Sequence, residues 1–199
     1  MKITMNIENQ HNQEWLSIAA FNDTFDWTKS IKTTFAAFFK YVTLHDSYWQ
    51  TINLTVTNET ILSIQLDAFW NKEYISTDNT DNWPFLVIKI PNVFNISYNT
   101  VDFATTIIGT SCNIITPEEI EKLIGVLTES NLFPKEFYNR LIDCSEVNKT
   151  RFEDVYGGNI EILHDSEILI LLLDEKGNYL DPSLDKIEPF DRKNEKKSF

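Results

Sequence analysis

Six consecutive apolar residues, Ile168 to Leu173, constrain the fold more than any other stretch of the chain. The run is too short to span a membrane and too uniformly apolar for a strand with one exposed face. It therefore predicts a strand that is buried on both faces; a helix is the rival interpretation, but the nearby Gly177 and the lack of a polar stripe count against it. Gly177 suits a tight hairpin, so residues 178–180 should return as a short antiparallel strand. Such a strand needs a packed layer on each side.

Alternating apolar and polar residues predict several more strands. Ile3 to Ile7 alternates cleanly, and the pair 52–57 and 62–67 flanks Asn58-Glu59 as a hairpin. Pro84 and Pro91 bracket another buried strand, Phe85 to Ile90. Residues 14–21 suit either a helix face or a returning strand; we expect the strand, which would make 2–21 a hairpin. Further strands are expected at 94–98, 101–108 and 160–163.

Two helical regions are expected to cover this sheet. Apolar residues at steps of three and four predict one amphipathic helix over about 26–44: Trp27, Ile31, Phe35, Phe38, Phe39 and Val42. Thr116, Pro117 and Glu119 form a capping pattern for a helix over 117–129. Pro134 opens a second helix after a short connection, so an αα-hairpin is expected over about 117–146.

The predicted fold class is therefore α+β, with a mainly antiparallel sheet of about six to eight strands covered by these helices. We expect one globular domain over residues 1–181, because no linker-like stretch divides it. Residues 182–199 mix both signs of charge with little apolar content, which predicts a charged, frayed C-terminal tail.

The net charge of −13 bears on the class of partner. It argues against nucleic acid and against an anionic membrane surface, since both are bound through Lys and Arg. It permits a basic protein partner, because opposite fields speed encounter, although acidity can also serve solubility alone. The N-terminal residues contain no secretory signal, so we expect a cytoplasmic protein with Cys112 and Cys144 as reduced thiols. The oligomeric state is not predicted.

No motif of catalysis, cofactor binding or metal binding is found, so we predict no catalytic, cofactor or metal residue. The three histidines lack zinc spacing, and Asp78 and Asp81 lie in a loop without the pattern of a calcium site. His45-Asp46 and His164-Asp165 are weak general-base pairs because chain neighbours do not face each other on a helix or strand. Cys112 with His164 is a weak thiol–imidazole hypothesis; the alternative is an inert, buried thiol.

These observations favour a non-enzymatic, acidic protein-binding domain, for example an inhibitor or immunity-type protein that captures a basic partner. Tryptophans and acids near residues 67–83 could form an aromatic anchor patch with an acidic rim, although core packing also explains such aromatics. The predicted partner-binding residues are Asp67, Trp70, Asp78, Asp81 and Trp83. The alternatives are an enzyme or small-ligand binder with a site assembled from scattered residues, and a structural subunit of a larger assembly.

Overall fold

The computed structural model describes residues 3–6, 13–54, 58–67, 69–71, 83–99, 106–130, 135–165 and 167–181. Within these residues the strands form one mainly antiparallel sheet of 11 strands, ordered β11-β10-β5-β4-β3-β7-β8-β9-β6, with β1 beside β3 and β2 beside β10. The helical elements are α1 (Glu14–Asn22), the 3₁₀ turn Trp27–Lys29, α2 (Phe35–Phe38), α3 (Pro117–Ser130) and α4 (Lys135–Asp143). The strands are β1 (Ile3–Asn6), β2 (Ile31–Thr33), β3 (Ser47–Leu54), β4 (Thr60–Gln65), β5 (Phe85–Ile90), β6 (Val93–Asn99), β7 (Thr106–Ile114), β8 (Asn148–Asp154), β9 (Asn159–His164), β10 (Ile168–Leu173) and β11 (Tyr179–Leu180).

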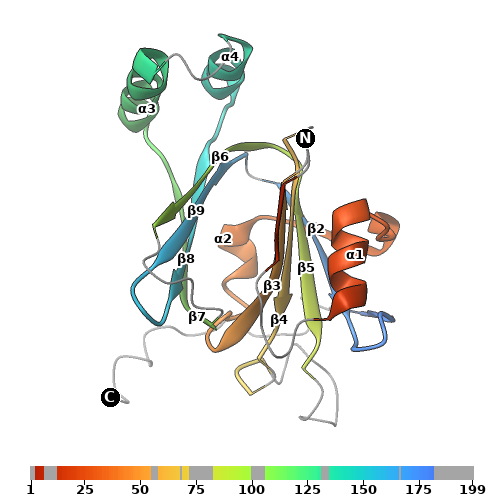
Figure 1. The fold of residues 1–199 in the computed structure, drawn as a ribbon. Coiled ribbons are helices and arrows are strands. Elements are labelled where there is room, and N and C mark those ends of the chain that lie inside the picture. Colours follow the sequence, from red (N-terminus) through yellow and green to blue (C-terminus); the bar gives the residue numbers. More distant parts are fainter. Residues whose placement is uncertain are drawn as a thin grey trace.

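The sheet bends into two arms that meet along β3 (Figure 1). One half of β3, residues 51–54, pairs with β1, and the other half pairs with β7 through Ser47 and Tyr48. A register shift between Trp49 and Thr51 separates these two halves. The broad class expected from sequence, α+β with antiparallel pairing, is confirmed, but the sheet has more strands than the six to eight predicted.

The main core fills the space inside the bend, where α2 lies between the two arms (Figure 1). Phe35, Phe38 and Phe39 pack there with inward-facing residues of both arms, such as Ile88 and Ile162. The Thr34 side chain caps this short helix by accepting a hydrogen bond from the N–H of Ala37 (3.1 Å). One side of β10 faces this core.

The prediction of a single helix over 26–44 is wrong. The segment divides into a 3₁₀ turn, strand β2 and the single-turn helix α2, because Ile31–Thr33 pairs with Ile168–Ile170 as part of the sheet. The apolar spacing arose because Phe35, Phe38 and Val42 do share one core, whereas Trp27 packs in a different cluster on the outer face. Tertiary pairing therefore overrides the helical period here.

Helix α1 covers the outer face of β4, β5 and β10 (Figure 1). Leu16 and Ala20, one helical turn apart, are both buried against residues such as Val87 and Leu171. The prediction of a strand over 14–21, and of a 2–21 hairpin, is therefore wrong: β1 pairs with β3 instead. The strand expected at 168–173 is confirmed, with cover on both faces, and Gly177 turns the chain into β11 with a φ of 81°.

Helices α3 and α4 are both present; they stand beyond the end of β7 and β8 and reach only one end of the sheet (Figure 1). They pack there with a small separate cluster that includes Phe94, Val147 and Leu163. The predicted cover of the sheet by an αα-hairpin over 117–146 is therefore not confirmed, and its connection, 131–134, lies outside the described residues. The predicted tail, 182–199, also lies outside them, and the single-domain assignment stays a prediction.

Candidate functional site

Two adjacent aromatic side chains are exposed in the turn that follows β4. Phe69 is 62% exposed and Trp70 is 39% exposed. We call residues 69–71, together with Asp67, the aromatic turn. It lies at the end of the sheet opposite to α3 and α4, where β4 ends and β3 begins. Large exposed aromatic residues side by side are unusual on a soluble surface and commonly mark a contact site.

Hydrogen bonds fix the backbone of the aromatic turn. The buried Asp67 carboxylate accepts from the backbone N–H groups of Phe69 (2.7 Å) and Trp70 (3.2 Å). The buried Asn71 amide donates to the carbonyls of Thr43 (2.9 Å) and Asp67 (2.8 Å), and its oxygen accepts from the N–H of Thr43 (3.1 Å). The turn is thus tied to the segment between α2 and β3, so the two aromatic residues are held before any partner arrives.

Trp70 extends this network to His45 and Asp46. Its indole N–H donates to Asp46 Oδ2 (3.0 Å), and its ring contacts the His45 ring edge-on, with centroids 5.3 Å apart. His45 Nδ1 also lies 3.0 Å from Asp46 Oδ2, although this approach is not aligned as a hydrogen bond. Asp46 has a φ of 60°, so the two neighbours sit in a turn and do face each other, contrary to the sequence-based argument.

The predicted partner-binding residues have different positions. Trp70 is exposed as expected, but Asp67 is buried and caps the turn, so it is not a rim residue. Trp83 is half-buried, stacks on Tyr48 at 5.7 Å and packs against the main core. The hydrogen bond from Leu66 N–H to the Pro84 carbonyl (2.8 Å) brings the segments of Asp67 and Trp83 side by side. The remaining two, Asp78 and Asp81, lie outside the described residues.

Sequence reasoning did not assign four members of this site: Phe69, Asn71, His45 and Asp46. Phe69 and Asn71 are the chain neighbours of Trp70, whereas His45 and Asp46 lie far from it in sequence. The available signal was an Asp followed by two aromatic residues directly after a strand. Asp commonly closes a turn by accepting from backbone N–H groups two or three residues on, which would have placed both aromatic residues on an outward turn.

Replacing Asp67 by alanine should lower the free energy of unfolding by about 1–3 kcal/mol, because two backbone N–H groups lose a buried, charged acceptor. Asp67→Asn keeps an acceptor oxygen at the same place and should cost clearly less. Equilibrium urea unfolding of both variants against the unchanged protein measures the difference. Equal losses for the two variants would show that the carboxylate acts through its charge and not as the cap described above.

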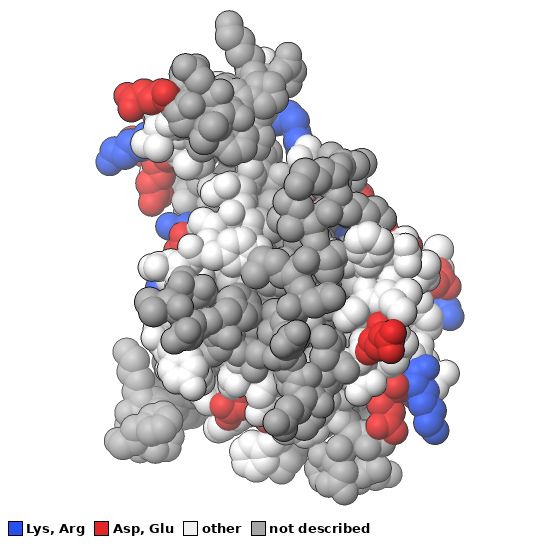
Figure 2. Space-filling view, in the orientation of Figure 1, with Lys and Arg blue, Asp and Glu red and all other residues white. Residues whose placement is uncertain are grey.

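Charged side chains are unevenly spread on the face shown in Figure 2. Those of the described residues lie mainly at the margins, near the helix pair and near α1, with acidic and basic groups side by side. The described part of this face therefore carries no broad acidic surface. The net charge of −13 belongs to the whole chain. Beside the aromatic turn, Asp46 is the carboxylate that contacts Trp70.

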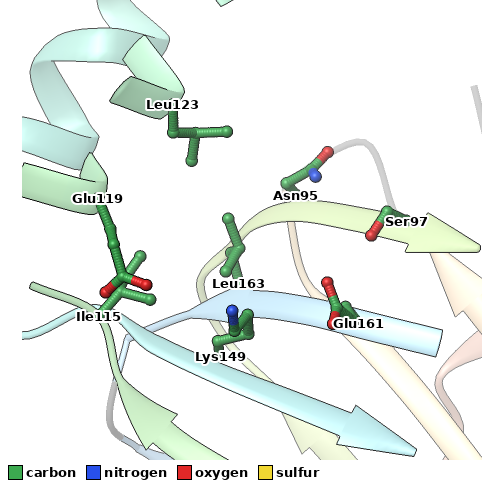
Figure 3. A pocket seen from close by; sticks show the side chains of 8 residues that line it. All are labelled: Asn95, Ser97, Ile115, Glu119, Leu123, Lys149, Glu161 and Leu163. Atoms are coloured by element: carbon green, nitrogen blue, oxygen red, sulfur yellow. The ribbon is translucent and has the colours of Figure 1, made fainter. Parts of the chain in front are cut away.

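Two cavities lie at the opposite end, beside the helix pair. One, of about 260 Å³, is bounded by α3 and by the outer face of β8, β9 and β6 (Figure 3). Its polar lining consists of Asn95, Ser97, Glu119, Lys149 and Glu161, and its apolar lining of Ile115, Leu123 and Leu163. The other cavity, of about 580 Å³, lies between α3, α4 and the ends of β7 and β8. Its lining is mainly apolar and includes Cys144, a half-buried free cysteine just after α4.

The buried His164 has no catalytic geometry. Its Nδ1 bonds to the Asp165 backbone carbonyl, which can only accept, so Nδ1 carries the proton and Nε2 accepts from the Thr150 hydroxyl (2.8 Å). Burial lowers the pKa of His164 to about 4. Cys112 Sγ hydrogen-bonds the Asn148 side-chain oxygen (3.8 Å) and lies opposite Thr150 on the neighbouring strand, so Thr150 stands between the two groups of the proposed thiol–imidazole pair. Burial raises the pKa of the Cys112 thiol, which leaves it a poor nucleophile.

Within the described ranges, no three His, Cys, Asp or Glu side chains are grouped as a metal site. No helix among those described has the length and apolar character needed to cross a membrane. Comparisons with protein families, curated proteins and solved structures found no match to this chain.

Proposed function

We propose that this chain is a non-enzymatic protein-binding domain of the inhibitor or immunity type, which captures a basic protein through the aromatic turn. The observation that carries the proposal is the pair Phe69 and Trp70, which are exposed and yet held in place by the Asp67 and Asn71 side chains. A preformed aromatic anchor loses little conformational entropy on binding, which is the usual basis of a strong contact residue.

The neighbouring carboxylate indicates the chemistry of the partner. The Asp46 carboxylate accepts a hydrogen bond from the Trp70 indole N–H, and its side chain is 45% exposed, so a partner can reach it. A lysine or arginine of a partner would meet an aromatic ring and a carboxylate together, which favours a cation through both cation–π attraction and ion pairing. The net charge of −13 adds long-range attraction for a basic protein, and salt should weaken that part of the binding.

A pull-down of the full chain from the source organism's lysate tests this proposal. The double variant Phe69→Ser/Trp70→Ser should retain about 30-fold less of the partner than the unchanged chain, because an anchor of this type is worth about 2 kcal/mol or more. The retained protein should be basic and stoichiometric, and its retention should fall between low and high salt.

The matched control is Ile18→Ser/Phe21→Ser on the exposed side of α1, where the two residues are 54% and 43% exposed. This variant removes a similar apolar area from a different surface and should retain the partner unchanged. Equal retention by both double variants would contradict the assignment of the aromatic turn. Failure of the unchanged chain to retain any basic protein at low salt would contradict the proposed function itself.

A further inference from the structure

The cavity beneath α3 has the lining of a small polar binding site. Three neighbouring strands form its floor: Asn95 and Lys149 lie on either side of Leu163, and Ser97 lies opposite Glu161. Leu123 of α3 and Ile115 complete an apolar side (Figure 3). At about 260 Å³ the cavity is slightly smaller than the pockets that hold drug-sized ligands, so its occupant would be a small metabolite.

Lys149 supplies the positive charge of this cavity. It forms no salt bridge within 4 Å among the described residues, although, besides a hydrogen bond from the Thr116 N–H, its charge helps to lower the pKa of Glu119, which lines the same cavity. Its half-buried side chain rises from the floor between Glu119 and Glu161 (Figure 3). Because no carboxylate contacts this ammonium group directly, its donors can hydrogen-bond an anionic group of a ligand.

The two glutamates of the cavity are not equivalent. Glu119 accepts a hydrogen bond from the Thr116 N–H (2.8 Å), and this bond lowers the pKa of Glu119, so its carboxylate is already used as the cap of α3. Glu161 forms a salt bridge with the Arg151 guanidinium through one carboxylate oxygen, at 3.6 Å, which is longer than a direct hydrogen bond. The other carboxylate oxygen of Glu161 can accept a hydrogen bond from a ligand cation.

Lys149 and Glu161 are diagonal neighbours on two paired strands, because Lys149 is opposite Leu163 and Arg151 is opposite Glu161. The backbone positions of such a diagonal pair lie roughly 7–8 Å apart, and no salt bridge of the described residues joins the two side chains. A ligand that carries both a carboxylate and an ammonium group can therefore pair with the lysine and with the glutamate at the same time. A simple anion would be repelled by the glutamates and a simple cation by the lysine, so a molecule carrying both charges suits the cavity best.

The geometry points to a binding site for a free α-amino acid with an apolar side chain. The ligand carboxylate lies at Lys149 and its ammonium group at Glu161, with the Asn95 amide and the Ser97 hydroxyl as further hydrogen-bonding groups. The ligand side chain packs against Leu123, Leu163 and Ile115. This site lies at the opposite end of the sheet from the aromatic turn and does not depend on the proposed protein-binding function.

Isothermal titration calorimetry of the full chain with L-leucine, L-isoleucine, L-methionine and L-phenylalanine tests the proposal. At least one of the four should bind. N-acetyl-L-leucine, which lacks the ammonium group, and L-leucinamide, which lacks the carboxylate, should each bind at least about tenfold more weakly than L-leucine or not at all, because a charged hydrogen-bonding pair is lost. This comparison needs no variant, so it does not depend on the folding of any mutant.

Lys149→Met and Glu161→Gln should each weaken the binding of the preferred amino acid by about tenfold or more, whereas Lys176→Met, on the exposed β10–β11 turn, should leave it unchanged. Thermal unfolding with and without the amino acid provides a second reading, since a ligand that binds the folded state raises the melting temperature. The proposal is overturned if none of the four amino acids binds at millimolar concentration, or if the acetylated or amidated derivative binds as well as L-leucine.

Discussion

Replacing Phe152 by alanine should lower the free energy of unfolding by about 3–5 kcal/mol, which is the usual cost of removing a fully buried phenylalanine ring. The ring is 1% exposed and lies on β8, in one arm of the bent sheet. It contacts Trp49 of β3 at a centroid distance of 5.0 Å, and Phe35 and Phe39 of the α2 segment at 6.0 and 6.5 Å, all at steep angles. Its removal therefore opens a cavity where both arms and the inner helix meet.

Urea unfolding, with the denaturant slope compared between variants, measures this effect. Phe69→Ala is the matched control, because the same ring is removed from a side chain that is 62% exposed; it should change stability by no more than about 0.5 kcal/mol. Phe152→Leu keeps most of the volume and should fall between the two. A loss below about 1 kcal/mol for Phe152→Ala would contradict a core shared by the two arms, since only a collapsible or independent site tolerates such a deletion.

The strands that sequence predicts correctly are those whose pattern is local. Ile168–Leu173 is a continuous apolar run, and Phe85–Ile90 is apolar except for Lys89; turn residues or prolines stand at their ends, and the two strands pair with each other at the centre of one arm. The hairpin around Asn58 was also predictable, and Asn58 adopts a φ of 61° where a glycine would be usual. In these cases the same residues satisfy both the local pattern and the final packing.

The wrong secondary-structure predictions concern segments whose structure is determined by tertiary contacts. Ile31 was assigned to a helix by its spacing from Trp27 and Phe35, yet it lies in an edge strand beside Ile170. Residues 14–21 were assigned to a strand by their β-branched and aromatic content, but the apolar outer face of β5 and β10 requires a cover, and α1 provides it. The sequence of residues 14–21 alone does not show that this apolar face must be covered, because the strands that form the face are distant in the chain.

The candidate sites were less predictable than the fold. Trp70 was identified from composition and proximity to acids, but the acid nearest in sequence, Asp67, proved to be a buried cap, whereas the carboxylate that contacts the indole is Asp46. The amino-acid cavity depends on the pairing of β6 with β9, two strands separated by about sixty residues of intervening chain. The β8–β9 hairpin brings Lys149 and Glu161 together, but Asn95 joins them only through the pairing of β6 with β9, which no sequence signal indicates.

His164 should make the protein lose about 3 kcal/mol of stability between pH 6.5 and pH 4, beyond the loss caused by other groups. Burial lowers the pKa of this histidine from its ordinary 6.5 to about 4 in the folded state. Above pH 6.5 the ring is neutral in both states, so the full contribution is present. As the pH falls below 6.5, the imidazole is protonated in the unfolded chain but stays neutral in the folded chain. The free energy of unfolding therefore decreases until the pH reaches the pKa of the folded state.

The groups around the ring support a neutral imidazole over this range. Thr150 donates to Nε2, the Asp165 carbonyl accepts from Nδ1, and the Phe35 ring lies 5.2 Å away. A second proton on Nε2 would therefore have no hydrogen-bond acceptor. The Asp165 carboxylate favours the charged ring, but burial outweighs it. The Cys112 thiol beside Thr150 has a raised pKa and stays neutral below pH 7. Of these two groups, His164 is therefore the one whose shifted pKa affects stability between pH 7.5 and pH 4.

Urea unfolding of the unchanged protein and of His164→Gln, at several values between pH 7.5 and pH 4, isolates this contribution. His164→Gln should be less stable at pH 7.5, because the packing and hydrogen bonds of the ring are altered, but its stability should fall with pH about 3 kcal/mol less than that of the unchanged protein. Phe152→Leu supplies the control, since it alters the core beside the ring through Phe35 without removing a titrating group and should keep the original pH dependence. Parallel curves for the unchanged protein and His164→Gln would mean that the buried imidazole is protonated as easily in the fold as in the unfolded chain, which its burial between Thr150 and Phe35 does not allow.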